Sequence, residues 1–262
     1  MTTETAPEAA PEQLEQAVRL LEAAQRIAVL TGAGASTESG IPDFRSPNGL
    51  WQRQLPTTYQ EFISSPEARK RYWELRVPIS RQMAEARPNA THEALTELER
   101  LGKLIAIITQ NIDGLHQAAG TSPERVIELH GTARQAACTH CNTRSPIAAL
   151  LERVAAGEDD PRCACGGYLK AATILFGQPL PRAELEQAVA LAITCDLFFV
   201  IGSSLRVNPA AQLPELAVER GVPLIILNHE PTPLDEQANI VLHATAGETL
   251  AQIIALLRKR SA

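Results

Sequence analysis

The chain has 262 residues, with 45% hydrophobic and 4% aromatic side chains, and its formal net charge is −6. This length suits one large α/β domain or one domain with insertions. The negative charge excludes the broad basic surface of a nucleic-acid-binding protein. No apolar run reaches transmembrane length, and the N-terminus has no basic region followed by an apolar core. We therefore expect a cytoplasmic protein that binds neither nucleic acid nor membranes.

The first predicted elements lead into a glycine-rich turn. Residues 1–11 are rich in Thr, Glu, Ala and Pro and predict a disordered tail. Apolar residues at helical spacing predict a helix over Glu12–Gln25, and Ile27–Leu30 is typical of a buried strand. Residues 32–36, GAGAS, then place glycines where a backbone bends and lets a phosphate approach. Such a turn begins a doubly wound α/β domain, although the third glycine of the usual dinucleotide fingerprint is absent.

The segment after this turn combines groups that can clamp a nucleotide. In GIPDFRS, residues 40–46, a stiff turn is followed by the Asp43 carboxylate, the Phe44 ring and the Arg45 guanidinium. Folded over a bound nucleotide, these groups could hold a ribose and a charged ring. Residues 57–86 contain four of the ten aromatic residues. We expect helices there that cover one side of the nucleotide, with most of the rings in the core.

Polar residues follow two of the next predicted strands. Leu104–Ile108 predicts a central parallel strand, and the polar sequence TQNIDGLH, residues 109–116, comes directly after it. Val126–Leu129 predicts another strand, which is followed by His130 and a glycine. Open α/β sheets bind their ligands at the carboxyl ends of such strands. The sequence therefore predicts a ligand site at this edge.

Four of the five cysteines form two close pairs, which are Cys138/Cys141 and Cys163/Cys165. In a reducing cytosol such a cluster favours a metal site over disulfides. Four thiolates complete a tetrahedral zinc shell and leave no position for water, so the predicted zinc is structural. An iron–sulfur cluster and a redox dithiol remain alternatives. We expect His140 to be exposed and Cys195 to be a small buried hydrophobe.

The remaining elements alternate as in a parallel sheet covered on both faces. Helices are predicted at Asn89–Leu101 with Asn89 as its cap, Arg182–Ala192, Leu213–Arg220 and Glu248–Arg258, and strands at Thr173–Phe176, Leu197–Ile201, Leu224–Leu227 and Ile240–Leu242. We predict an α/β fold: a doubly wound, mostly parallel, Rossmann-like sheet with a smaller zinc-binding and helical module formed by insertions. The Rossmann-like domain is expected at 12–45, 87–131 and 171–262, the helical module at 46–86 and the zinc-binding module at 132–170.

The motifs occur in an order that resembles the sirtuins, the NAD-dependent protein deacylases, of the bacterial type. They are GAGASTESGIPDFRS, TQNIDGLH, the His-Gly pair, the paired cysteines, FGQPLP and GSSLRVNPA. The similarity runs from about Leu20 to Leu257. The resemblance implies that NAD is consumed as a co-substrate and that structural Zn²⁺ fills the cysteine cluster. It also implies an acyl-lysine protein or peptide as partner, and we expect a monomer.

The resemblance also assigns roles to residues. His130 is the expected catalytic base, since a histidine is neutral near pH 7 and can accept a proton. Asn111 and Asp113 are expected to position nicotinamide. The implied cofactor contacts are Gly32, Ala33, Gly34, Thr37, Asp43, Phe44, Arg45, Trp51, Gln110, Asn111, Asp113, Gly202, Ser203, Ser204, Asn228 and Ala246. The implied contacts of the substrate peptide are Phe176, Gly177, Val207 and Asn208.

In the implied reaction, the acetyl-lysine oxygen attacks the nicotinamide ribose and nicotinamide leaves. His130 then takes a proton from a ribose hydroxyl, and the acyl group passes to ADP-ribose. The expected function is therefore NAD-dependent protein lysine deacetylation. A mono-ADP-ribosyltransferase and a non-catalytic module that senses NAD or ADP-ribose remain alternatives. An ordinary dehydrogenase is disfavoured because the glycine fingerprint is incomplete.

Departures from the family concern substrate choice. Relatives that prefer acidic acyl groups carry a Tyr-x-x-Arg pair in the helical segment, and this chain has Trp73 and Arg76 in that register. An indole is bulkier and donates a single hydrogen bond, so we expect deacetylation to exceed desuccinylation. Gln178 stands where many relatives carry glutamate, and Ala171 where proline is frequent. These changes bear on peptide preference and not on the reaction.

Overall fold

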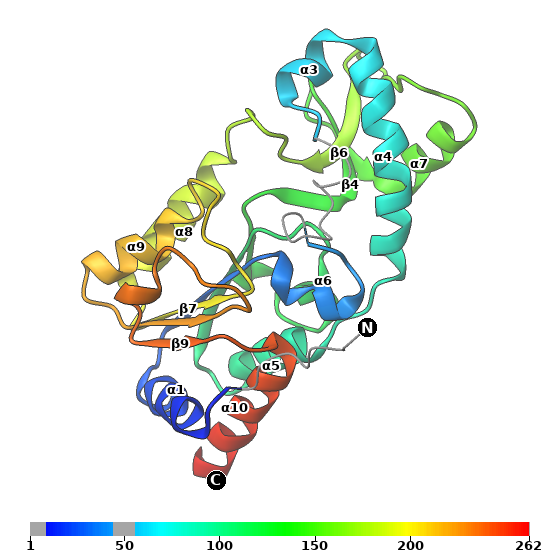
Figure 1. The fold of residues 1–262 in the computed structure, drawn as a ribbon. Helices are drawn as coiled ribbons and strands as arrows, with labels where there is room; N and C mark the ends of the chain where they lie inside the picture. Colours follow the sequence, from blue (N-terminus) through cyan, green and yellow to red (C-terminus); the bar gives the residue numbers. More distant parts are fainter. Residues whose placement is uncertain (1–8, 44–55, 262) are drawn as a thin grey trace.

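The structure is a computed structural model that describes residues 9–43 and 56–261 (Figure 1). Most of the predicted tail lies outside these ranges, and so do the predicted cofactor contacts Phe44, Arg45 and Trp51. Pro11, which the prediction included in the tail, is the first residue of helix α1, Pro11–Ala23. None of the helices in the described ranges is long and apolar enough to cross a membrane.

Within the described residues, a parallel sheet of six strands forms the larger part of the molecule (Figure 1). Its strand order is β3-β2-β1-β7-β8-β9, and all neighbouring strands are parallel. The chain starts at the centre, fills one side and then returns to fill the other, which is the order of a Rossmann sheet. The predicted fold class is confirmed. The strands are β1 (Ile27–Thr31), β2 (Leu104–Thr109), β3 (Val126–Glu128), β7 (Leu197–Ile201), β8 (Leu224–Leu227) and β9 (Ile240–Leu242).

Helices cover both faces of this sheet. One face packs against α1, α5 (Ala90–Arg100) and α10 (Ala246–Ser261), and the other packs against α8 (Arg182–Thr194) and α9 (Gln212–Glu219). In β1, Ile27 and Val29 join the first core, whereas Ala28 and Leu30 join the second, because successive side chains of a strand point to opposite faces. Burial on both faces explains why these strands are continuous apolar runs in the sequence.

The segments inserted into this order fold together into a second unit, called the small lobe below (top of Figure 1). Its antiparallel sheet has β4 (Gly131–Cys138) between β5 (Arg144–Pro146) and β6 (Leu169–Thr173), and its helices are α3 (Tyr59–Ser64), α4 (Pro66–Glu85) and α7 (Ile147–Ala155). Phe62, Tyr72, Trp73, Ala136 and Leu150 form its core. The Tyr72 ring meets the rings of Phe62 and Trp73 edge to face, with centroids 5.0 and 5.1 Å away. The predicted core role of these aromatic residues is confirmed.

Most predicted elements are present with slightly shifted ends. The cap of α5 is confirmed, because the Asn89 side chain accepts hydrogen bonds from the Thr91 and His92 N–H groups. The predicted strand Thr173–Phe176 is wrong. Thr173 ends β6 of the small lobe, where it pairs with Gly131, and the chain then leaves the sheet. The short elements that sequence reasoning did not assign are α6 (Leu115–Ala118), α7, β4, β5 and the 3₁₀ turns η1 (Ala33–Ala35), η2 (Thr37–Ser39), η3 (Pro123–Arg125) and η4 (Asp235–Gln237). We propose that the chain divides into a Rossmann-like domain and two inserted modules, with the second module extended to the end of β6.

Candidate active site

A cleft of about 1290 Å³ lies along the carboxyl edge of the parallel sheet and reaches the small lobe. Residues that follow five of the strands line it: Gly32 after β1, Gln110 after β2, His130 after β3, Gly202 after β7 and Asn228 after β8. Strand β1 lies between β2 and β7, and from these two strands the sheet continues in opposite directions. The cleft therefore opens at the point where the strand order reverses. Doubly wound sheets bind their ligands at this point.

Glycines let the loops after β1 and β7 meet through their backbones. Gly34 donates its N–H to the Gly202 carbonyl at 2.9 Å, and Gly32 donates to the Ile201 carbonyl at 3.0 Å. A Cβ on Gly32 would lie 2.6 Å from the Gly202 oxygen, and a Cβ on Gly202 would lie 2.3 Å from the Ala35 nitrogen. Gly202 also has a φ of 62°, which other residues rarely adopt. The floor of the cleft is therefore bare backbone, which suits the approach of a diphosphate.

His130 stands on the wall of the cleft. Its Nδ1 lies 2.9 Å from the Gln110 carbonyl oxygen. Because a carbonyl oxygen can only accept a hydrogen bond, Nδ1 carries the proton and Nε2 holds the lone pair. Burial lowers the pKa of His130 below its ordinary value, and the hydrogen bond to Gln110 offsets part of this effect. The ring is neutral near pH 7, and Nε2 is the atom that can take up a proton.

The side chains of Asn111 and Asp113 hold the glycine turn in place through hydrogen bonds. The Asn111 amide donates to the Gly32 carbonyl at 3.0 Å and to Ser36 Oγ at 3.1 Å. Ser36 in turn donates to Asp113 Oδ2 at 2.8 Å, and the Leu115 N–H donates to Asp113 Oδ1 at 2.9 Å. Asp113 is buried and is not among the described residues that line the cleft. In this structure Asp113 fixes Ser36 and the start of α6, while Asn111 reaches the cleft itself.

A buried polar layer beneath the site was missed by sequence reasoning. Thr31 donates to Thr109 Oγ1 at 2.8 Å, and Thr109 accepts the Asn111 N–H at 3.0 Å. His116 Nε2 lies 3.0 Å from Thr31 Oγ1, and the rings of His116 and His92 are 4.8 Å apart. Burial lowers the pKa of His92 to about 4 and that of His116 to about 3, so both rings are neutral. The sequence signal that could have revealed this buried layer was a threonine at the end of each of two adjacent strands.

The cleft brings together most of the residues predicted for the site. Those that line it are Gly32, Ala33, Gly34, Thr37, Asp43, Gln110, Asn111, His130, Phe176, Gly177, Gly202, Ser203, Ser204, Val207, Asn208, Asn228 and Ala246. A hydrogen bond of 2.8 Å from the Gln110 side chain to Ser203 Oγ joins the loops after β2 and β7. Residues from five strands and the small lobe thus share one cleft, as the edge argument predicted.

Helix α4 supplies one wall of the cleft, in the segment where helices covering one side of the nucleotide were expected. The lining residues of α4 are Tyr72, Leu75, Arg76, Pro78, Ile79 and Gln82. Arg76 is 8% exposed, and its Nε and Nη2 have no hydrogen-bond partner among the described residues. The place predicted for Trp73 is corrected, because its ring is 1% exposed and lies in the small-lobe core. Tyr72, which also packs in that core, lines the cleft one helical turn before Arg76 on the same face of α4.

The sulfur atoms of Cys138, Cys141, Cys163 and Cys165 all lie within 4.8 Å of one another. The closest pairs are 3.5 and 3.7 Å apart. Four Zn–S bonds of about 2.3 Å in a tetrahedron separate the sulfur atoms by about 3.8 Å, so the cluster fits one zinc ion. His140 is exposed, as predicted. Cys195 is buried away from the cluster, and burial raises the pKa of its thiol to about 11, as expected of a small hydrophobe.

Comparison with known proteins agrees with this geometry. A family model described as the Sir2 family matches residues 32–209, which is more than half of the chain and includes the glycine turn, His130 and the cysteine cluster. The chain belongs to the Sir2 family. A Streptomyces coelicolor relative, "NAD-dependent protein deacetylase 2", is 48% identical over 233 residues, which cover 87% of this chain and 96% of the relative.

Solved Sir2 structures share the whole fold. One structure of a Sir2 enzyme matches with a TM-score of 0.86 at 39% identity and covers 96% of this chain and 100% of its own. A structure of Sir2 with a p53 peptide and NAD⁺ matches with a TM-score of 0.83 at 33% identity and covers 95% of this chain and 98% of its own. The Sir2 fold therefore includes both the Rossmann-like sheet and the small lobe of this chain.

Proposed function

We propose that the cleft removes acetyl groups from lysine side chains of proteins and consumes NAD in the reaction. The observation that carries this proposal is the neutral His130 ring, whose Nε2 is ready to accept a proton beside a bare-backbone loop suited to a dinucleotide. Relatives that are 48% and 44% identical to this chain are NAD-dependent protein deacetylases. The chain is accordingly an NAD-dependent protein deacetylase of the Sir2 family.

The residues of the cleft divide the work of binding NAD. The turn at Gly32–Gly34 and the serines Ser203 and Ser204 would hold the diphosphate, since backbone N–H groups and hydroxyls donate to phosphate oxygens. Asn228 and Ala246, after β8 and at the start of α10, would hold the adenosine half. Bound there, NAD supplies a ribose carbon activated by a good leaving group. We assign Asp113 a role through Ser36 and the turn, since both of its oxygens are already engaged.

His130 would act as the base of the acyl-transfer step. Its Nε2 takes a proton from a ribose hydroxyl, which makes that oxygen a nucleophile toward the acyl carbon. The Gln110 carbonyl holds the ring through Nδ1 and favours the protonated ring that results. The Asn111 amide nitrogen already donates to Gly32 and Ser36, so Oδ1 is the atom suited to accept a hydrogen bond from the nicotinamide carboxamide. One water is consumed overall, and the products are free lysine, nicotinamide and an acylated ADP-ribose.

An acyl-lysine peptide is the second substrate that we propose. Phe176, Gly177, Val207 and Asn208 all line the cleft, and an extended peptide would lie between these two segments as an added strand. Phe176 is 43% exposed and is the one large hydrophobic side chain among the described residues that is exposed. A Sir2 relative has been solved with a p53 peptide and NAD⁺.

Acetyl is the acyl group that we propose as preferred. Leu75, Pro78 and Ile79 of α4 give this wall of the cleft an apolar surface, which suits a short uncharged acyl chain. Arg76 is the feature that opposes this preference. Its unpaired donors would stabilise a carboxylate at the end of a longer acyl chain.

The four cysteines would hold Zn²⁺ as a structural ion. Four thiolate ligands close the coordination shell, so the ion offers no position for water or substrate. The thiol cluster also requires a reducing compartment, and we therefore propose a cytoplasmic protein. We propose a monomer that binds neither nucleic acid nor membranes, and light scattering of the purified protein tests the oligomeric state.

The deciding experiment offers the purified protein NAD and a panel of acetyl-, succinyl- and longer acyl-lysine peptides. We expect nicotinamide and acylated ADP-ribose to form in equal amounts, with one acetyl lost from each peptide. A gain of ADP-ribose on an acceptor protein would instead favour the mono-ADP-ribosyltransferase alternative. Binding of NAD without any release of nicotinamide would favour the sensing module.

A further inference from the structure

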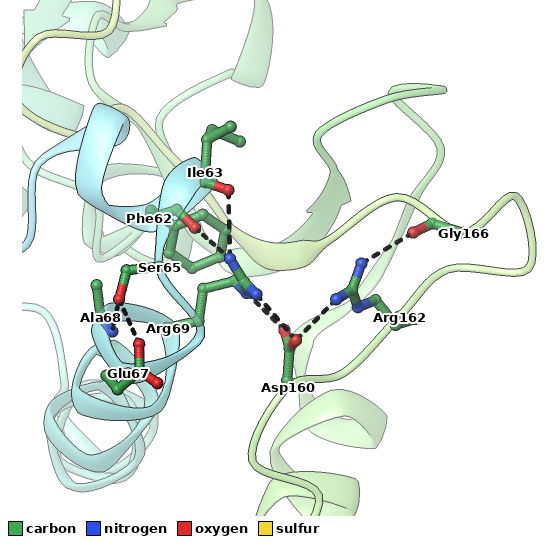
Figure 2. Close-up of polar contacts among 9 residues, drawn as sticks. All are labelled: Phe62, Ile63, Ser65, Glu67, Ala68, Arg69, Asp160, Arg162 and Gly166. Atoms are coloured by element: carbon green, nitrogen blue, oxygen red, sulfur yellow. Dashed lines mark hydrogen bonds and ion pairs between the residues drawn. The ribbon is translucent and has the colours of Figure 1, made fainter.

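One buried cation of the small lobe joins segments that are far apart in the sequence. Arg69 in α4 is 2% exposed. Its Nε and Nη2 donate to the two oxygens of Asp160 at 2.7 and 3.1 Å (Figure 2). Its Nη1 donates to the carbonyl oxygens of Phe62 and Ile63 at 3.0 and 3.3 Å. Every nitrogen of the guanidinium is thus paired, so the buried charge is compensated only while these partners stay in place.

Asp160 belongs to the loop that precedes the second cysteine pair, and it is held from two sides. Arg162 Nη2 donates to Asp160 Oδ2 at 2.9 Å, and its Nη1 donates to the Gly166 carbonyl at 3.3 Å (Figure 2). The guanidinium groups of Arg69 and Arg162 also lie over the Tyr168 ring, 3.7 and 4.0 Å from its centroid. These contacts tie the cysteine-bearing loop to the first turns of α4.

The other side of Arg69 holds helix α3. Phe62 and Ile63 lie near the carboxyl end of α3, where carbonyl groups lack helical partners and a cation is favourable. At the opposite end, Tyr59 is the first residue of α3 and donates its N–H to the Phe176 carbonyl at 2.8 Å. A continuous set of hydrogen bonds therefore runs from Asp160 through Arg69 and α3 to the segment that faces the cleft.

We propose that Arg69 and Asp160 are positioning residues for the protein substrate, because they hold α3 and through it the Phe176 backbone. This inference rests on the proposed function, since it assumes that the peptide lies along Phe176 and Gly177. The Arg69–Asp160 pair affects binding of the peptide substrate and not binding of NAD. The cofactor side of the cleft is built from the loops after β1 and β7, which this set of contacts does not include. Loss of the pair weakens binding of the peptide and leaves binding of NAD unchanged.

The ion pair formed by the residue after Arg69 and the residue before Asp160 provides a matched control. Lys70 Nζ lies 2.9 Å from Asp159 Oδ2, and their side chains are 53% and 60% exposed. Exposed ion pairs contribute little to stability. Asp159→Asn therefore removes the same charge as Asp160→Asn and leaves the buried contacts intact.

Steady-state kinetics with an acetyl-lysine peptide and NAD tests the proposal. For Asp160→Asn we expect the KM for the peptide to rise about tenfold, equivalent to about 1.4 kcal/mol, while kcat and the KM for NAD change less than about twofold. Asp160→Glu keeps the charge and should recover part of the loss, and Asp159→Asn should match the unmodified protein. An equal rise of both KM values, or a lower kcat with an unchanged peptide KM, would overturn the proposal.

Hydrogen exchange provides a readout that does not depend on turnover. We expect the Tyr59 amide, bonded to the Phe176 carbonyl, to exchange faster in Asp160→Asn than in Asp159→Asn. Equal exchange in the two variants contradicts the link. If Asp160→Asn does not fold, Asp160→Glu and Arg69→Lys, which keep the charge of each partner, carry the same comparison. Failure of the unmodified protein to release nicotinamide would refute the proposed function instead, and the exchange result could still be read.

Discussion

The two ends of the cleft are built in different ways. At the cofactor end, the loops after β1 and β7 meet through the backbones of Gly34 and Gly202, and the polar groups of Asn111 and Asp113 beneath them are hydrogen-bonded. At the α4 end (the acyl end), where we propose that the acyl group lies, Arg76 lines the cleft and its Nε and Nη2 have no partner among the described residues. The first end has its geometry fixed by backbone contact. We propose that the second end leaves donors that a substrate can satisfy, and that substrate choice is decided there.

The largest effect is expected at His130, which stands between the two ends. His130→Ala removes the proton acceptor, so we expect kcat to fall about a thousandfold, within the range for a general base. Binding of NAD should persist, because the loops after β1 and β7 are untouched. Product formation and calorimetric NAD titration measure the two effects. His140→Ala, a change at an exposed histidine of the small lobe, is the control. A His130→Ala enzyme with undiminished turnover would assign the base to another group.

The next largest effect tests whether backbone contact between the loops fixes the shape of the cofactor end of the cleft. In Gly202→Ala the new methyl group would lie 2.3 Å from the Ala35 nitrogen, at a φ of 62°. The loops must separate, and we expect the KM for NAD to rise about a hundredfold, equivalent to about 2.7 kcal/mol. Gly221→Ala is the matched control, because Gly221 has a φ of 75° and a Cβ added there would meet nothing within 4 Å. If both variants bind NAD equally well, the glycine contact does not shape this end.

The cofactor end was predictable because its residues are local to strand ends. Each of Gly32, Gln110, His130 and Gly202 follows an apolar run in the sequence, and parallel strands bring their carboxyl ends to one edge. The bonding of Asp113 was harder to foresee. Whether a carboxylate faces a ligand or a neighbouring hydroxyl depends on Ser36, which a different loop delivers.

The acyl end was poorly predicted for a related reason. Helical periodicity identifies α4, but the face that meets the cleft depends on the antiparallel sheet packed against it. Tyr72 bonds to the Ala171 N–H of β6 at 3.1 Å, while Trp73 turns into the small-lobe core. The run at Thr173–Phe176 resembles a strand of the main sheet by composition alone. Its first residue instead closes the antiparallel pairing with Gly131, which is a contact between distant segments that no local pattern contains.

A smaller effect tests the unsatisfied donors of the acyl end. Arg76→Met removes a buried guanidinium whose Nε and Nη2 have no partner among the described residues and keeps most of its volume. We expect activity on a succinyl-lysine peptide to fall about tenfold, since an interaction with a charged group contributes about 1.5 kcal/mol or more. Activity on the acetyl peptide should change little, and the melting temperature should not fall. Equal losses on both peptides would mean that Arg76 supports the cleft and does not select the acyl group.

The last comparison separates pH effects on stability from pH effects on activity. Burial lowers the pKa of His92 to about 4 and that of His116 to about 3. In the unfolded chain both would titrate near 6.5, so below that pH the unfolded state binds more protons than the folded state. Stability therefore falls as pH drops, by about 1.4 kcal/mol per pH unit for each such histidine.

As the pH is lowered, activity should decline at a lower pH than stability does. The pKa of His130 is also lowered by burial, so the acid limb of kcat/KM should lie below the ordinary histidine value. Thermal melts and kinetics at 25 °C, both followed from pH 8 downward, measure the two responses. We expect the melting temperature to decline first, while kcat/KM is still level. Stability falls once His92 and His116 can be protonated in the unfolded chain, whereas kcat/KM falls only when His130 is protonated in the folded cleft. A kcat/KM that declines before the melting temperature would show that His130 titrates as an exposed histidine, and the cleft would then lack the buried base on which its chemistry depends.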